Sequence, residues 1–228
     1  MVRGLNAVSP SHFLCIVTSL LLVSTAGAET RTVDRIAVRF WASETGGAER
    51  PQFITERLLA FEGRLEAMVE GAGPTAPLQE RLLRAAMERH IAEEMLSSLR
   101  GEDPRGMAPT WRLYATLGRA LLERAGGEAA VMVAAALEGI GRVEVDSVLR
   151  RQVQAAVYLD RTGTPLLEPT DEQLREYYRT APHPYRNISF DRAKGPLGGW
   201  FSVERLRAAE GMYFQGARAR IKVIRVVP

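Results

Sequence analysis

The stretches VDRIAVRF (residues 33–40) and RARIKVIRVV (residues 218–227) decide the fold, because both alternate apolar and polar residues. Ile36, Val38 and Phe40 share one face of the first stretch. A period of two residues is typical of a half-buried β-strand. A lone strand leaves its backbone hydrogen bonds unmade, and each of these strands has only the other as a strong partner. We therefore expect the C-terminal strand to fold back and pair with the N-terminal strand.

Between the two strands the apolar residues recur at helical spacing. In QFITERLLAFEGRLEAMVEG (52–71), Ile54, Leu58 and Phe61 are four and three residues apart, and Pro51 suits a first helical turn. KGPLGG (194–199) contains three glycines and a proline, which is typical of a loop. The sequence predicts a mainly α fold with helices over 51–70, 77–99, 111–125, 128–137, 143–159, from 170, and 200–209.

The segment EPTDEQLREYY (168–178) predicts a helix that begins after Thr170. Thr170 and Gln173 have the spacing of a capping box, in which each side chain binds a free backbone N–H of the first turn. Asp171 and Glu172 favour the positive end of the helix dipole. We interpret this helix as the point where the chain turns back, with Tyr177 and Tyr178 as packing residues.

The first 28 residues have the pattern of a secretory signal peptide. Arg3 precedes an apolar run from Phe13 to Val23, and Ala26-Gly27-Ala28 fits a small-residue cleavage site near Ala28. An uncleaved anchor is disfavoured because the apolar run is shorter than the roughly 20 residues that span a bilayer. A lipoprotein is disfavoured because Cys15 lies early in that run. We expect cleavage and a periplasmic location, without stable membrane insertion.

Cleavage would leave residues 29–228, which we expect to form a single domain. Cys15 is the chain's one cysteine, so the mature domain would have no disulfide, thiol nucleophile or cysteine-bound metal. The formal net charge of +3 is small for 228 residues and gives no electrostatic reason to expect a nucleic-acid partner.

Four segments, in this order, resemble the N-terminal domain of SurA-type periplasmic chaperones and their foldase relatives. They are VDRIAVRF (33–40), LQERLLRAAMERHIAEEM (78–95), VEVDSVLRRQVQAAVYLDR (143–161) and EPTDEQLREYY (168–178). The resemblance covers residues 32–180 and implies a helical chaperone fold. Residues 185–228 resemble the family's returning C-terminal segment, whose helix and strand would fold back on residues 32–40.

The chain also departs from the family pattern. Trp41 to Arg50 form a longer connection than the family's short turn. Family members commonly carry a parvulin-type prolyl isomerase domain after the helix that matches 168–178, and residues 179–228 are too few to hold one. The resemblance therefore implies a chaperone module that lacks its isomerase.

No motif indicates an enzyme. His90 and Glu93 lie on one expected helix and superficially resemble part of a zinc site, but neither HExxH nor HxxEH is present and the other histidine after the leader is His183. We interpret His90 and Glu93 as part of a solvated charged face. We predict no catalytic residue, no metal and no cofactor.

Aromatic side chains are the better functional candidates, because a chaperone needs accessible apolar surface. The candidates for client binding are Trp41, Phe53, Trp111 and Tyr114, although a core position remains the alternative for each. We read Met87 and Met95 as core residues.

We expect an ATP-independent chaperone-like protein that binds extended apolar segments of unfolded or partly folded exported proteins, in a cleft between the helices and the terminal strands. The alternative is an adaptor of the cell envelope that reuses the same fold for one stable partner.

Overall fold

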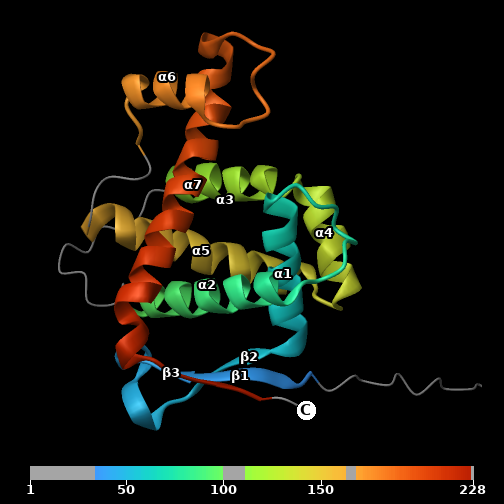
Figure 1. The fold of residues 1–228 in the computed structure, drawn as a ribbon, viewed down its shortest axis with the longest axis vertical. Coiled ribbons are helices and arrows are strands. Elements are labelled where there is room, and N and C mark those ends of the chain that lie inside the picture. The colour runs from blue at the N-terminus through green and yellow to red at the C-terminus, as the bar shows by residue number, and fades with distance from the viewer. Residues whose placement is uncertain (1–33, 100–110, 163–167, 227–228) are drawn as a thin grey trace, which may run out of the picture. The chain divides into compact units, whose positions relative to one another are not determined.

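The computed structural model describes residues 34–99, 111–162 and 168–226, and residues 34–228 form one compact unit. The expected leader, residues 1–28, lies outside the described residues. The described part is mainly helical and contains seven α-helices and a small antiparallel sheet. Figure 1 shows all of these helices on one side of the sheet.

The sheet has three strands, β1 (Ile36–Trp41), β2 (Gln52–Thr55) and β3 (Lys222–Arg225), in the order β2-β1-β3. β1 pairs with β3 in antiparallel register, with Arg39 opposite Ile224. The pairing of the N-terminal and C-terminal strands that the sequence predicts is therefore confirmed. β1 is the central strand, so β2 and β3 are both edge strands.

The second strand corrects the sequence prediction for residues 51–55. We expected a helix from Pro51, whereas Gln52–Thr55 pair with β1 and helix α1 begins only at Glu56. Phe53, Ile54 and Thr55 are aromatic or β-branched, which suits a strand. Ile54 also has the right spacing from Leu58 for a helix, and this coincidence hid the change of period.

The helices are α1 (Glu56–Val69), α2 (Glu80–Ser98), α3 (Trp111–Arg124), α4 (Glu128–Leu137), α5 (Arg142–Thr162), α6 (Asp171–Thr180) and α7 (Phe190–Ala217). Short 3₁₀ turns cover Ser43–Thr45, Gly47–Glu49 and Arg218–Arg220. The sequence predicted α4 with the observed bounds and placed α2, α3 and α5 within three residues at each end. The capping box at the start of α6 is also confirmed, with Gln173 N donating to Thr170 Oγ1 at 3.2 Å.

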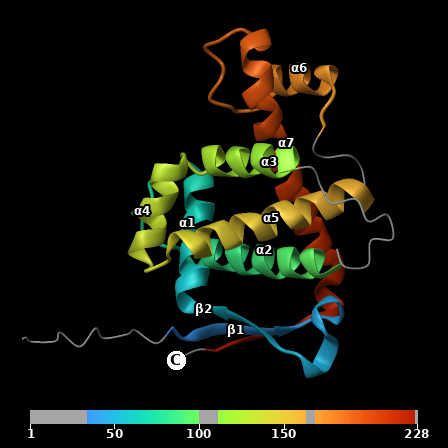
Figure 2. The same cartoon turned by 180° about the vertical axis from the view of Figure 1, so that it is seen from behind.

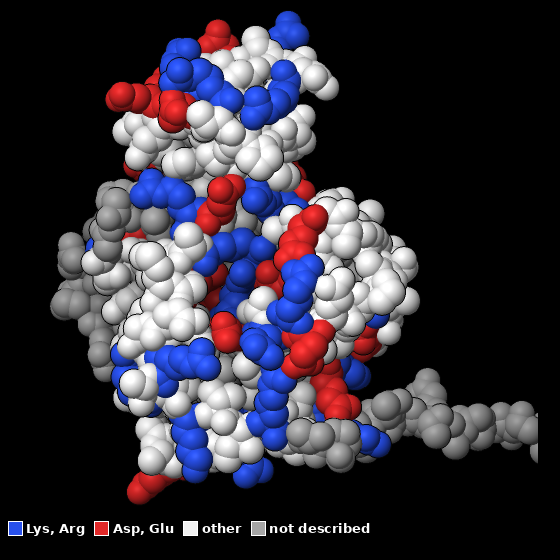
Figure 3. All heavy atoms as spheres, in the orientation of Figure 1, with Lys and Arg blue, Asp and Glu red and all other residues white. Residues whose placement is uncertain are grey.

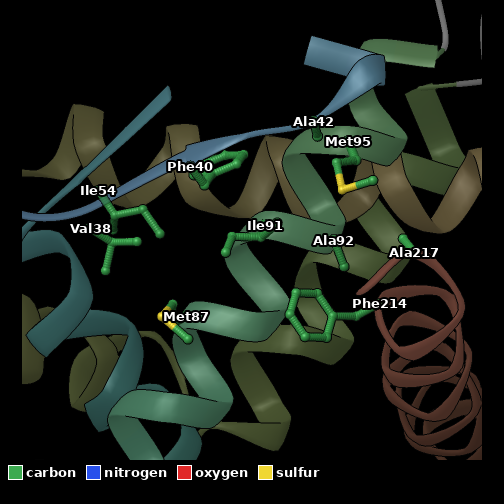
Figure 4. Packing of buried hydrophobic residues seen from close by; sticks show 10 residues of the cluster. All are labelled: Val38, Phe40, Ala42, Ile54, Met87, Ile91, Ala92, Met95, Phe214 and Ala217. Atoms are coloured by element: carbon green, nitrogen blue, oxygen red, sulfur yellow. The ribbon is translucent and has the colours of Figure 1, made fainter. Parts of the chain in front are cut away.

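One hydrophobic cluster fills the space between the sheet and the helices. Val38, Phe40 and Ile54 point from the sheet toward Ile91 and Met95 of α2, as Figure 4 shows. These five side chains are at most 1% exposed. The full cluster consists of Val38, Phe40, Ala42, Ile54, Met87, Ile91, Ala92, Met95, Phe214 and Ala217. No client segment fits between the sheet and α2, so the cleft that we expected there is filled.

Helix α7 corrects the sequence prediction for the C-terminal region. We expected a loop at 194–199 followed by a short helix at 200–209, whereas one helix runs without interruption from Phe190 to Ala217 and contains Pro196. An interior proline removes one helical hydrogen bond and costs about 3 kcal/mol. Buried side chains that follow it in the helix, among them Leu197 and Leu206, hold the helix against α6 and α3. Tertiary packing therefore outweighs local propensity here.

Gly199 of α7 is a packing residue and not the turn residue that we expected. A Cβ at this position would lie 2.8 Å from the Cβ of Ala120 on α3. Glycine thus permits the close approach of α3 and α7, whose contact Figures 1 and 2 both show.

We predict that Gly199→Ala destabilises the protein by about 1–3 kcal/mol, because the added methyl group overpacks the α3–α7 contact. Gly211→Ala is the matched control: it lies on the same helix and nothing lies within 4 Å of its added Cβ. The control should gain up to about 1 kcal/mol from helix propensity. Urea unfolding measures both, and an equal gain in both variants would contradict the packing role of Gly199.

Candidate functional site: an uncovered sheet face and a buried ionic cluster

The sheet face that points away from α2, here called the outer face, carries apolar side chains from all three strands. A bulge in β1 between Ile36 and Val38 turns Ile36 outward, where simple alternation placed it beside Val38 and Phe40. The apolar side chains on the outer face are Ile36, Trp41, Phe53, Ile224 and Val226. Four of them are exposed by 37–45%, and Trp41 is half-buried.

Two of the four predicted client-binding residues meet on this outer face. Trp41 ends β1, rather than lying in a loop, and Phe53 lies on β2 opposite Arg39. Each aromatic ring has a cation from a neighbouring strand beside it. Arg39 Cζ is 5.4 Å from the centre of the Phe53 ring, and Lys222 Nζ is 4.9 Å from the centre of the Trp41 ring. These distances suit cation–π contacts.

The other two predicted residues, Trp111 and Tyr114, lie in the first turn of α3, away from the sheet in sequence. Their side chains lie outside the described part of the structure. Met87 and Met95 are buried in the core cluster, as predicted.

A second open surface lies between α6 and α7, and sequence reasoning did not predict it. It is a groove of about 860 Å³ with Tyr178, Phe190 and Phe201 among its walls. Tyr177 also contributes to the wall of the groove, although its side chain is mostly buried, and its hydroxyl donates to Glu204. The packing role that we predicted for Tyr177 is confirmed, while half-buried Tyr178 contributes to both the packing and the groove. Phe190 and Phe201, eleven residues apart, would have indicated a shared helix face if 190–201 had been read as one helix.

The helices enclose a cluster of buried ion pairs in the middle of the protein. Its first half joins α1, α2 and α5. Glu62 accepts hydrogen bonds from Arg151 and from Nδ1 of His90, the latter at 3.0 Å. Arg151 Nε also donates to Glu93 at 3.0 Å. Glu62, His90 and Glu93 are each at most 5% exposed.

The second half of the cluster joins α7 to α1 and α2. Glu66 forms ion pairs with Arg89 at 2.7 Å and with Arg207 at 3.2 Å. Glu210 lies 3.6 Å from Arg89 Nε and is 2% exposed. Figure 3 shows basic and acidic side chains gathered in a recess in the middle of the molecular face that is drawn there.

A cavity of about 30 Å³ adjoins this second half of the cluster, and Arg89, Glu93, Arg207 and Glu210 line its polar side. That volume has room for about two water molecules. One carboxylate oxygen of Glu93 and one of Glu210 are buried and have no hydrogen-bond partner among the described residues. A buried unpartnered carboxylate is costly, so protonation of these groups is favoured.

The pKa values of three buried carboxyl groups, Glu62, Glu93 and Glu210, diverge because their surroundings differ. Burial acts to raise the pKa of Glu62, but the charges of Arg151 and His90 outweigh it and lower that pKa to about 2. Burial and the charge of Glu93 raise the pKa of Glu210 to about 8, against the opposing charges of Arg89 and Arg207. Burial likewise raises the pKa of Glu93. The cluster therefore holds a firmly ionised carboxylate, Glu62, and a carboxyl that favours its protonated form near neutral pH, Glu210.

The positions of His90 and Glu93 correct the sequence interpretation. We expected a solvated charged face, whereas both side chains are buried among ion pairs. The missed signal was the position of Glu62 and Glu66 beside Phe61 and Leu65 in the core-facing stripe of α1. Within the described ranges, no group of three or more histidine, cysteine or acidic side chains is arranged to hold a metal ion.

Comparison of the chain with protein-family models, with curated proteins and with solved structures finds no match. The resemblance to SurA-type chaperones therefore stays a prediction. Among the described helices, none is both long and apolar enough to cross a bilayer.

We predict that Arg151→Met destabilises the protein by about 3–5 kcal/mol, because it leaves Glu62 and Glu93 buried without their counter-charge. Arg142→Met is the matched control. It removes exposed ion pairs to Glu128 and Asp146, which solvent screens and which contribute little to stability. Urea unfolding at pH 7 compares the two, and similar small losses would contradict the structural role of the cluster.

We also predict that Glu210→Gln removes part of the pH dependence of stability. A raised native pKa means that the carboxyl stabilises the fold fully below its ordinary pKa of about 4.5, and that this contribution is lost as the pH rises through about 8. The amide imitates the protonated carboxyl at every pH. The variant should match the wild type near pH 5 and exceed its unfolding free energy by on the order of 3 kcal/mol at pH 9.

Urea unfolding between pH 5 and pH 9 measures this difference. Glu128→Gln, on the surface of α4, is the control, and its stability curve should run parallel to that of the wild type. A parallel curve for Glu210→Gln as well would contradict the prediction.

Proposed function

We propose that this protein is an ATP-independent, chaperone-like protein that binds extended apolar segments of exported proteins in the periplasm, without prolyl isomerase activity. The observation that carries the proposal is the outer face of the sheet, which no described helix or strand covers. It presents Trp41, Phe53 and Ile224 together, and an edge strand bounds it on either side. The resemblance to SurA-type chaperones, together with the signal-like leader, supports the compartment and the class of client.

The outer face suits weak and reversible binding. Burying one large apolar side chain gains about 1.5–3 kcal/mol, and association itself costs several kcal/mol. A few contacts with half-exposed residues therefore hold a client without trapping it. The edge strands offer unpaired backbone groups to an extended client, which is the usual route of strand addition.

The alternative proposal is an envelope adaptor that uses the same face for one folded partner. Exposed apolar residues on a sheet serve either purpose. The two proposals differ in breadth. A chaperone delays the aggregation of several unrelated unfolded proteins, whereas an adaptor captures one partner and leaves unfolded chains alone.

We predict that the protein suppresses the aggregation of a chemically denatured client at stoichiometric ratio, measured by light scattering, and that Phe53→Ser weakens this suppression about tenfold. The serine removes a ring contact that is expected to contribute on the order of 1.4 kcal/mol, which corresponds to a factor of ten. Val143→Ser is the matched control, because Val143 is also exposed but begins α5, away from the sheet.

Thermal unfolding shows whether both variants keep the fold. Two results would contradict the proposal: no suppression by the wild-type protein with any client, or equal losses in Phe53→Ser and Val143→Ser.

A further inference from the structure

The charged residues on the outer face are all basic within the described strands. Arg39 lies on β1 and Lys222 on β3, and both side chains are exposed. Neither has an acidic partner among the described residues. At the margin of the sheet, by contrast, Arg220 is paired with Glu44 and Arg225 with Glu80. Glu44 and Glu80 are thus paired with other cations, and Arg39 and Lys222 keep their positive charge beside the apolar residues of the outer face.

The free edge of β3 determines which residues an added strand would contact. The N–H of Val226 donates to Ala37 of β1 at 2.8 Å. Because alternate residues of a strand turn their backbone groups to the same side, Lys222 and Ile224 also face β1. The backbone groups of Val223 and Arg225 then point to the free edge. A segment added there binds the backbone of Val223 and Arg225 and sets its side chains beside Lys222, Ile224 and Val226.

We propose that this face prefers extended segments in which two apolar residues and then an acidic residue alternate with other residues, in the pattern apolar-x-apolar-x-Asp/Glu. In antiparallel pairing the two apolar residues lie opposite Val226 and Ile224, and the acid lies opposite Lys222. Antiparallel pairing is chosen because the whole sheet is antiparallel and this ladder is the more stable per residue. Cross-strand pairs of opposite charge are favourable and pairs of like charge are not.

This inference rests on the proposed function and narrows its class of client. An anionic membrane surface would satisfy the same cations and apolar residues. The free edge favours a peptide, because lipid offers nothing that pairs with the backbone of Val223 and Arg225, whereas a strand does.

The test measures binding of three labelled peptides to the full chain by fluorescence anisotropy. The peptides share their length and apolar residues and carry Asp, Asn or Lys at the last position of the pattern. We expect the Asp peptide to bind about threefold more tightly than the Asn peptide, which is the range of an exposed cross-strand charge pair, and the Lys peptide to bind most weakly. The advantage of Asp should shrink when the salt concentration is raised, because surface charge pairs are screened.

Two variants test the assignment to Lys222. Lys222→Glu should reverse the order and favour the Lys peptide. Arg150→Glu, which makes the same change of charge on the exposed face of α5, should leave the order unchanged. Methylation of the peptide nitrogens that face Val223 and Arg225 should abolish binding, and methylation of the alternate nitrogens should not.

The outcomes separate this inference from the proposed function. Equal, salt-independent binding of the three peptides would overturn the acidic preference and leave apolar client binding standing. No binding of any peptide, together with no suppression of aggregation, would overturn both. Binding of anionic phospholipid vesicles in place of all three peptides, lost in Lys222→Glu, would overturn the peptide assignment in favour of a membrane surface.

Discussion

The buried ion pairs of α2 are the constraint on which the arrangement of the helices depends. Arg89, His90 and Glu93 lie on neighbouring positions around α2, and each needs a polar partner because an unpaired buried polar or charged group is costly. The partners come from α1, α5 and α7. Apolar contacts alone are non-directional and would tolerate several helix orientations. The ion pairs select one of them, and with it the position of α7, whose C-terminal end leads into β3.

Helix α2 also fixes the position of the sheet, but through apolar contacts in place of ion pairs. Ile91 and Met95 of α2 bury the inner face of β1, on a different side of the helix from Arg89 and Glu93. The outer face of the sheet has no corresponding helix among the described elements. Helix α2 therefore contributes both to the buried ion pairs and to the apolar contact with the inner face of the sheet. The outer face remains exposed among the described elements, and it has the features of a binding site.

Local signals in the sequence predicted those elements whose causes are local. The capping box at Thr170 and Gln173 and the strands β1 and β3 can be recognised within a few residues, and the structure has them, although a bulge interrupts the alternation of β1. The start of α1 and the continuity of α7 were not readable. Pro196 breaks a helix unless packing with distant segments compensates, and that packing is invisible in a local window. The candidate site was partly predictable: Trp41 and Phe53 were named, but their partners Arg39 and Lys222 depend on strand register.

The central position of β1 has a consequence for how the protein folds. β1 and β2 are made first, whereas β3 follows every described helix in the chain. Until β3 docks, one edge of β1 stays unpaired, and its Val38 and Phe40 lie beside an open ladder. Closure of such a long-range pair is intrinsically slow. Until then, β1 exposes an unpaired strand edge, as an aggregation-prone client does. The docking of β3 removes that exposure.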